Sequence, residues 1–89
     1  DEQYKKVSDN IERFKLKIVE NNGRIEDYGK QIIHRQEKLS SSDDPIYKHR
    51  VKITITHLEQ SKKVREENSK LLNRYIESGH QVMEVYKAS

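Results

Sequence analysis

The chain has 89 residues, of which 31% are hydrophobic and 37% charged, and 18 Lys and Arg against 15 Asp and Glu give it a net charge of +3 at pH 7. A chain of this length forms one small domain at most. Because it contains no cysteine, disulfides, thiolate zinc sites and cysteine nucleophiles are excluded. No apolar run approaches the roughly 20 residues that cross a membrane.

The low apolar content favours a coiled coil over a globular domain or a disordered chain. A coiled coil needs apolar side chains only at heptad positions a and d, about two residues in seven. Disorder is instead typical of chains with high net charge and no periodicity. Basic and acidic residues are mixed in both halves of the chain, which therefore has neither a basic arm nor an acidic tail. Because Asp1 comes first and Met83 is the only methionine, we expect a segment of a larger protein or a processed product.

Residues 1–39 carry a heptad pattern that predicts the first helix of a coiled coil. We call the a and d positions of each helix its seam. An Asn in the seam can fix the register of a coiled coil, or it can lie at a hydrated edge of the interface. The predicted seam of this helix consists of Tyr4, Val7, Ile11, Phe14, Ile18, Asn21, Ile25, Tyr28 and Ile32.

The Asn22-Gly23 pair is the local signal against a continuous first helix, because Asn and Gly often end helices. The heptad frame nevertheless crosses this pair without a slip, and Glu20 and Arg24 form a favourable i,i+4 pair around it. We predict one helix that is weakened at its middle, with a break at Gly23 as the alternative.

Residues 40–45 form the predicted loop, in which three serines and two aspartates precede Pro45. Asp44 suits the N-cap of a second helix, and Pro45 suits the first helical position, where its missing N–H costs nothing.

The second predicted helix covers residues 46–89 and is less regular, since its middle, residues 59–70, is mostly polar. Residues 51–56 are β-branched except for Lys52 and alternate like a strand, but a lone strand would have nothing to pair with. A helix is therefore the better interpretation. Its predicted seam residues are Val51, Ile55, Leu58, Leu72, Tyr75 and Val82.

A short loop between two long helices predicts an antiparallel coiled-coil hairpin, so the expected fold class is all-α. In this arrangement, the residue numbers of two residues that face each other sum to roughly 85. Val7 is expected opposite Gly79, and Asn21 opposite Val64 and Arg65.

The group that most resembles a binding site lies at the loop end of this hairpin, where basic and histidine residues of both helices converge. Such a group can bind an acidic partner protein, and the alternative is a solvated tip. These partner-binding candidates are His34, Arg35, Lys38, Lys48, His49, Arg50 and Lys52.

Several apolar residues fall outside the seam, and a single hairpin would not cover all of them. We therefore expect either a homodimer or another homo-oligomer, or a partner helix packed on the hairpin. These residues are Leu16, Val19, Ile33, Ile46, Ile53 and Leu71.

The sequence offers little for catalysis or metal binding. No two of the four histidines are spaced i,i+3 or i,i+4, and the three glycines are isolated, so no phosphate-binding loop is formed. A two-helix rod also lacks the concave site that catalysis needs. We expect no enzymatic activity, no cofactor and no metal. The histidines are His34, His49, His57 and His80.

Residues 58–64 (Leu-Glu-Gln-Ser-Lys-Lys-Val), running on to Leu71 and Leu72, resemble the second helix of Rho-effector homology-region domains of the protein-kinase-N kind. That family consists of antiparallel coiled-coil hairpins of similar length. The first helix departs from the family pattern, with Gly-Arg-Ile-Glu at 23–26 in place of Gly-Ala-Glu-Asn. The resemblance implies binding of a Rho-type GTPase.

The sequence as a whole predicts a non-catalytic coiled-coil module for protein–protein interaction and assembly. The alternative is a binding domain for one specific protein, such as a Rho-type small GTPase or a host factor. Mixed charge disfavours nucleic acid as the partner, and the sequence leaves the cellular compartment open.

Overall fold

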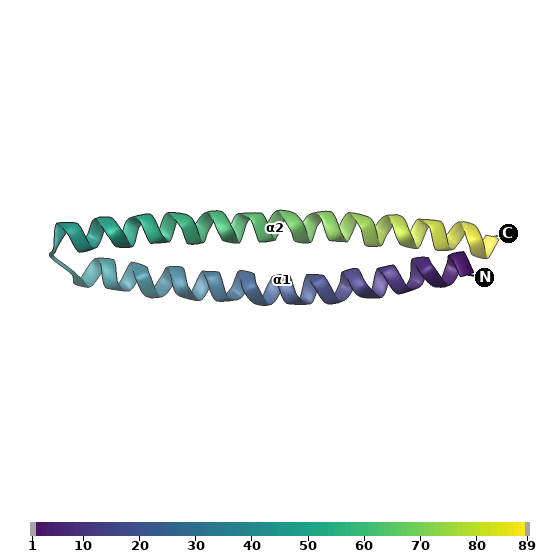
Figure 1. Cartoon of the computed structure of the whole chain (residues 1–89), viewed down its shortest axis with the longest axis horizontal. Coiled ribbons are helices and arrows are strands. Elements are labelled where there is room, and N and C mark those ends of the chain that lie inside the picture. Colours follow the sequence, from purple (N-terminus) through teal and green to yellow (C-terminus); the bar gives the residue numbers. More distant parts are fainter. Residues whose placement is uncertain (1, 89) are drawn as a thin grey trace.

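The computed structural model describes residues 2–88, which form two long helices, α1 (Glu2–Ser41) and α2 (Pro45–Ala88). The helices lie side by side and antiparallel, residues 42–44 join them, and both termini lie at the same end (Figure 1). The molecule is a rod of 68 × 14 × 14 Å. The predicted all-α helical hairpin is confirmed.

The first helix ends two residues later than expected, and the side chains of its last two serines donate to carbonyl groups three or four residues earlier. Ser40 Oγ donates to the Gln36 carbonyl and Ser41 Oγ donates to the Lys38 carbonyl, each at 3.1 Å. A serine hydroxyl commonly donates to a carbonyl three or four residues earlier while the helix continues. Both serines therefore belong to α1 rather than to the predicted loop at 40–45.

The second helix begins as its cap signal predicts. Asp44 Oδ1 accepts the backbone N–H of Ile46 at 3.0 Å, and the Asp44 carbonyl accepts the N–H of Lys48 at 3.0 Å. The Asp44 N–H in turn donates to Ser42 Oγ at 3.3 Å. Asp44 is thus the N-cap, and Pro45 is the first residue of α2 rather than the last of the loop.

Both helices are continuous where the sequence left alternatives open. No described residue has a positive φ, so α1 does not break at Gly23, and the Glu20–Arg24 pair spans this position at 3.5 Å. Residues 51–56 are helical as well. Thr54 Oγ1 there donates to the carbonyl four residues earlier at 3.1 Å, which is how a helix accommodates a threonine hydroxyl.

The seam of α1 lies where the heptads predict, and that of α2 differs in its last third. All nine predicted α1 positions are buried or half-buried, as are Val51, Ile55, Leu58 and Leu72 on α2. Tyr75 and Val82, however, remain 49% and 42% exposed, and Ile76 and Met83 are half-buried in their place. The correction follows from the α2 spacing, which continues without a slip through the half-buried or buried Lys62, Arg65 and Ser69. This spacing places Leu72 and then Ile76 at the following seam positions.

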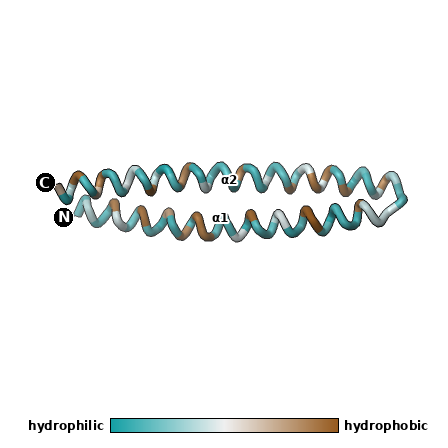
Figure 2. Tube along the Cα trace, turned by 180° about the vertical axis from the view of Figure 1, so that it is seen from behind, coloured by the Kyte–Doolittle hydropathy of each residue, from teal (hydrophilic) through white to brown (hydrophobic). Residues whose placement is uncertain are grey.

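The seam has an apolar part near the loop and a polar part at its centre. Near the loop, Ile32, Val51 and Ile55 are buried together, and Leu39 and Leu58 pack against them. Figure 2 shows the contrast as a largely hydrophilic middle of α2 between more hydrophobic segments. Within residues 2–88, neither helix has a segment long and apolar enough to span a membrane.

Candidate functional site: a groove along one face of the hairpin

The C-terminal half of α2 carries apolar side chains in two lines, of which the seam packs against α1 and the other only borders it. The other line also follows heptad spacing and is exposed by 42–69%. A helix with apolar residues on two faces is typical of bundles with more than two helices. We call this line the second stripe; it consists of Val64, Leu71, Tyr75, Val82 and Val85.

One end of the second stripe borders an apolar hollow of about 290 Å³ between the helices. Phe14 and Tyr75 meet across it with ring centroids 5.6 Å apart. Gly79 lets the helices approach here, because a Cβ at this position would lie 2.9 Å from Ile11 Cγ1. Val7 and Val82 complete the apolar lining, and Asn10 and Ser78 form its rim.

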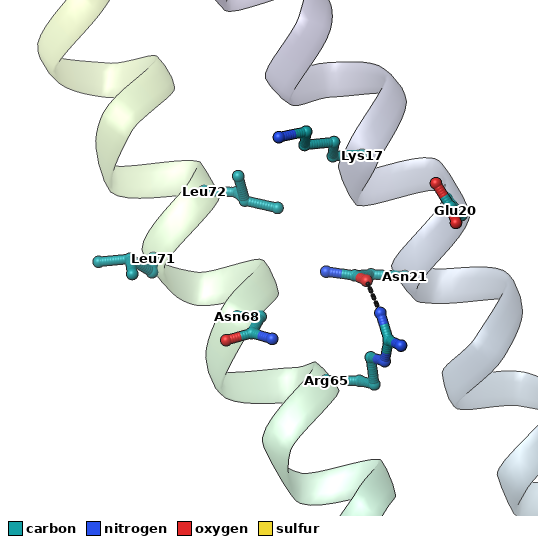
Figure 3. Close-up of a pocket in the computed structure, with 7 residues that line it drawn as sticks. All are labelled: Lys17, Glu20, Asn21, Arg65, Asn68, Leu71 and Leu72. Carbon is teal, nitrogen blue, oxygen red and sulfur yellow. Dashed lines mark hydrogen bonds between the residues drawn. The ribbon is translucent and has the colours of Figure 1, made fainter.

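About three turns further along the rod, the same groove becomes polar. We call this part, a recess of about 320 Å³, the notch. Arg65 Nη1 donates to Asn21 Oδ1 at 3.0 Å, so the buried Asn21 side chain is satisfied by a residue of the other helix. Figure 3 shows the side chains of Lys17, Asn21 and Arg65 turned toward the space between the helices, with Asn68 on the α2 side. The lining is Lys17, Glu20, Asn21, Arg65, Asn68, Leu71 and Leu72.

The hollow and the notch open on the same side of the hairpin, which we call the groove face. Asn10 and Lys17 of α1 line them, and residues three or four positions away share this side of the helix. Lys6 and Arg13 therefore belong to the same rim. No carboxylate in the described part of the chain lies within 4.0 Å of Arg13, Lys17 or Arg65. The groove face thus combines an apolar stripe with a mainly basic rim, in which Glu20 is the carboxylate that lines the notch.

The predicted loop-end candidates lie at one end of the rod but not on one surface. Arg35 and Lys48 are half-buried at seam positions, and the other candidates are exposed. Heptad positions place His34, Lys38 and Arg50 on the groove face, and His49 and Lys52 on the opposite face. No ion pair or hydrogen bond in residues 2–88 joins the side chains of any two of them.

The six predicted off-seam apolar residues are all exposed, by 44–70%, but they too are divided among faces. Leu16, Val19 and Ile33 lie on the outer side of α1, and Ile46 and Ile53 on the back of α2, as their heptad positions require. Only Leu71 belongs to the second stripe. The predicted seam includes Tyr75 and Val82 and therefore does not separate them from this stripe, although the spacing of its five residues is visible in the sequence.

No model of a known protein family matches this chain, and no curated protein and no solved structure matches it either. The likeness of residues 58–64 to Rho-effector domains stays a prediction. Among the described residues, no group of three His, Asp or Glu side chains is placed to hold a metal ion.

Proposed function

We propose that this chain is a non-catalytic module for protein–protein interaction and assembly, which binds a further amphipathic helix along its groove face. The observation that carries the proposal is the second stripe. Its five apolar side chains are 42–69% exposed and extend over about 32 Å of helix. Fully burying a side chain of this kind is worth about 1.5–3 kcal/mol, so covering the stripe would drive association.

Charge favours a different chain over a second copy as the occupant. A twofold axis near Tyr75 would lay the second stripe of one hairpin on that of another. The same operation would bring Lys6, Arg13 and Lys17 of both copies onto one side of the bundle, and like charges brought together oppose binding. A partner helix with acidic flanks would instead complement this rim. The homodimer is therefore the less supported form of the assembly.

The other candidate function, a binding domain for one acidic protein such as a Rho-type GTPase or a host factor, would use the loop-end residues. Because these residues are divided between opposite faces, a single partner can contact only some of them. Binding of this kind would depend strongly on salt.

The proposal is tested in two steps, on the wild-type chain and on two variants. Light scattering over a range of concentrations first gives the mass in solution. The chain is then used to select binders from a displayed library of amphipathic helices with variable flanking charge. The stripe variant carries Leu71→Lys and Val82→Lys. The control carries Leu16→Lys and Val19→Lys, which change equally exposed apolar residues on another face. Circular dichroism verifies that both remain helical.

We expect a monomer that selects helices with acidic flanks, and we expect their binding to be lost in the stripe variant and kept in the control. A mass that doubles with concentration, and no longer does so in the stripe variant, would make the groove face a homodimer interface and overturn the partner helix. If the selected helices bind the stripe variant as tightly as the wild-type chain, or if the selection yields no binders, the proposal is overturned.

A further inference from the structure

We propose that the notch is a receptor for a carboxylate, so that the docked helix carries an Asp or Glu at one of its own inward-facing positions. This inference rests on the function proposed above and specifies the chemistry of the partner. The recess between Lys17, Asn21 and Arg65 is its basis.

The notch holds two cations, and no carboxylate among residues 2–88 forms an ion pair with either of them. Arg65 is half-buried at a seam position, and its one hydrogen bond goes to the neutral Asn21 oxygen, although a guanidinium has five N–H donors. The notch's own carboxylate, Glu20, pairs with Arg24 at 3.5 Å and is not directed at Arg65 (Figure 3). Two cations, Lys17 and Arg65, therefore face the recess without a counter-charge.

The remaining groups of the notch also suit a carboxylate. Because Asn21 Oδ1 accepts the Arg65 N–H, the Asn21 amide nitrogen points into the space between the helices (Figure 3), where it can donate. Asn68 adds a second amide from α2. A guanidinium binds a carboxylate through two parallel hydrogen bonds, and the amides can donate to its remaining lone pairs.

A helix on the second stripe necessarily passes over the notch, because Leu71 belongs to both. Docking would remove Arg65 further from water, and a buried charge without a partner is costly. The same contact would thus penalise helices with an apolar or basic residue at this point. Discrimination of this kind gives specificity as well as affinity.

The distance between the notch and the apolar hollow sets the spacing in the partner. On both α1 and α2 the residues that line the two recesses are offset by about ten positions, or ~15 Å along the helix. We expect a large apolar residue in the partner that fills the hollow, and its acidic residue about ten positions, close to three turns, away.

The helix library described above also tests this inference. Helices selected on the wild-type chain are sequenced, and the acidic residue of a selected helix is replaced by its amide (Glu→Gln or Asp→Asn). We expect acidic residues to be enriched at that one position and the amide to weaken binding about tenfold to a hundredfold, as measured by fluorescence anisotropy.

With Arg65→Met, which keeps an unbranched stem in the seam, we expect most of the difference in affinity between acid and amide forms to be lost. Lys17→Met, an exposed position, should reduce the preference without affecting folding and serves if Arg65→Met lowers the helix content. Lys30→Met is the matched control, since Lys30 pairs with Glu26 at 3.4 Å and neither residue lines the notch, and it should keep the full preference. Helices that need the second stripe but show no preference for the acid would overturn the carboxylate receptor alone. Loss of stripe-dependent binding would overturn the docking function as well.

Discussion

The loop half and the centre of the hairpin share one helix geometry but not one chemistry. Near the loop the seam buries Ile32, Val51 and Ile55 against each other. At the centre it holds Asn21 and Arg65, joined by a 3.0 Å hydrogen bond. The first arrangement gains free energy from apolar burial. The second gains little, because the polar groups lose water when they pair. The loop half therefore holds the rod together, whereas the centre is open to a role in recognition.

Truncation of a side chain in the loop half should have the largest effect. Ile32→Ala removes a side chain that is 8% exposed and should lower the free energy of unfolding by about 2–4 kcal/mol. Ile33→Ala is the matched control, because the neighbouring side chain is 58% exposed, and it should change the stability by less than about 0.5 kcal/mol. Urea denaturation measures both. Equal losses would remove the distinction between seam and surface.

The polar centre should respond differently to single and double substitution. Asn21→Leu leaves Arg65 without its hydrogen-bond acceptor and should cost about 1–3 kcal/mol. Adding Arg65→Leu replaces the pair by apolar side chains and should restore the wild-type stability or exceed it. Thermal melts of the two variants make the comparison. A double variant as unstable as the single one would mean that the two residues are not coupled.

A Gly→Ala substitution distinguishes a packed position from an open one, because the change in stability should have opposite signs at the two. Gly79→Ala puts a methyl group 2.9 Å from Ile11 Cγ1, and its overpacking should outweigh the gain in helix propensity, for a net loss of up to about 2 kcal/mol. At Gly23 a Cβ meets nothing within 4 Å, so Gly23→Ala should stabilise by about 0.5–1 kcal/mol. Stabilisation by both changes would show that the helices can separate at Gly79 without cost. The midpoints of urea denaturation are the measurement.

The smallest effect is expected for an ion pair at the centre. Lys62 and Glu66 lie 4.0 Å apart, with side chains 38% and 48% exposed, and the base precedes the acid, the less favourable order on a helix. Glu66→Gln should therefore lower the stability by less than about 0.5 kcal/mol. The free energy of unfolding is measured by urea denaturation at low salt. A larger loss would indicate that the centre of the rod is stabilised by its own ion pairs and does not depend on the apolar seam near the loop.

The sequence was sufficient for the fold, the loop cap and the whole seam of α1, because each follows from local spacing or from a cap signal. It was insufficient for the last third of α2. There the heptad phase passes through Lys62, Arg65 and Ser69, polar residues that conceal a seam, so that Tyr75 and Val82 were assigned to the wrong side. Asn21 was expected opposite Val64 and Arg65. The notch, however, forms because Arg65 faces α1 and Val64 is exposed.

The choice between them was a matter of about 100° of rotation around α2. The loop-end candidates were limited by the same uncertainty. Their number and charge were visible in the sequence, whereas their division between two faces depends on the phase of each helix relative to the seam.

The tight reversal at residues 42–44 also has a consequence for how this rod can be attached to other proteins. Both ends of the chain emerge side by side at one tip (Figure 1), and the reversal lies at the other end of a 68 Å rod. The hairpin can therefore be inserted into a surface loop of another protein without moving the two sides of the insertion point apart. Domains whose two ends lie close together are generally tolerated as insertions. Mounted in this way, it would act as a side arm that displays its groove along its length and carries the reversal at its far tip.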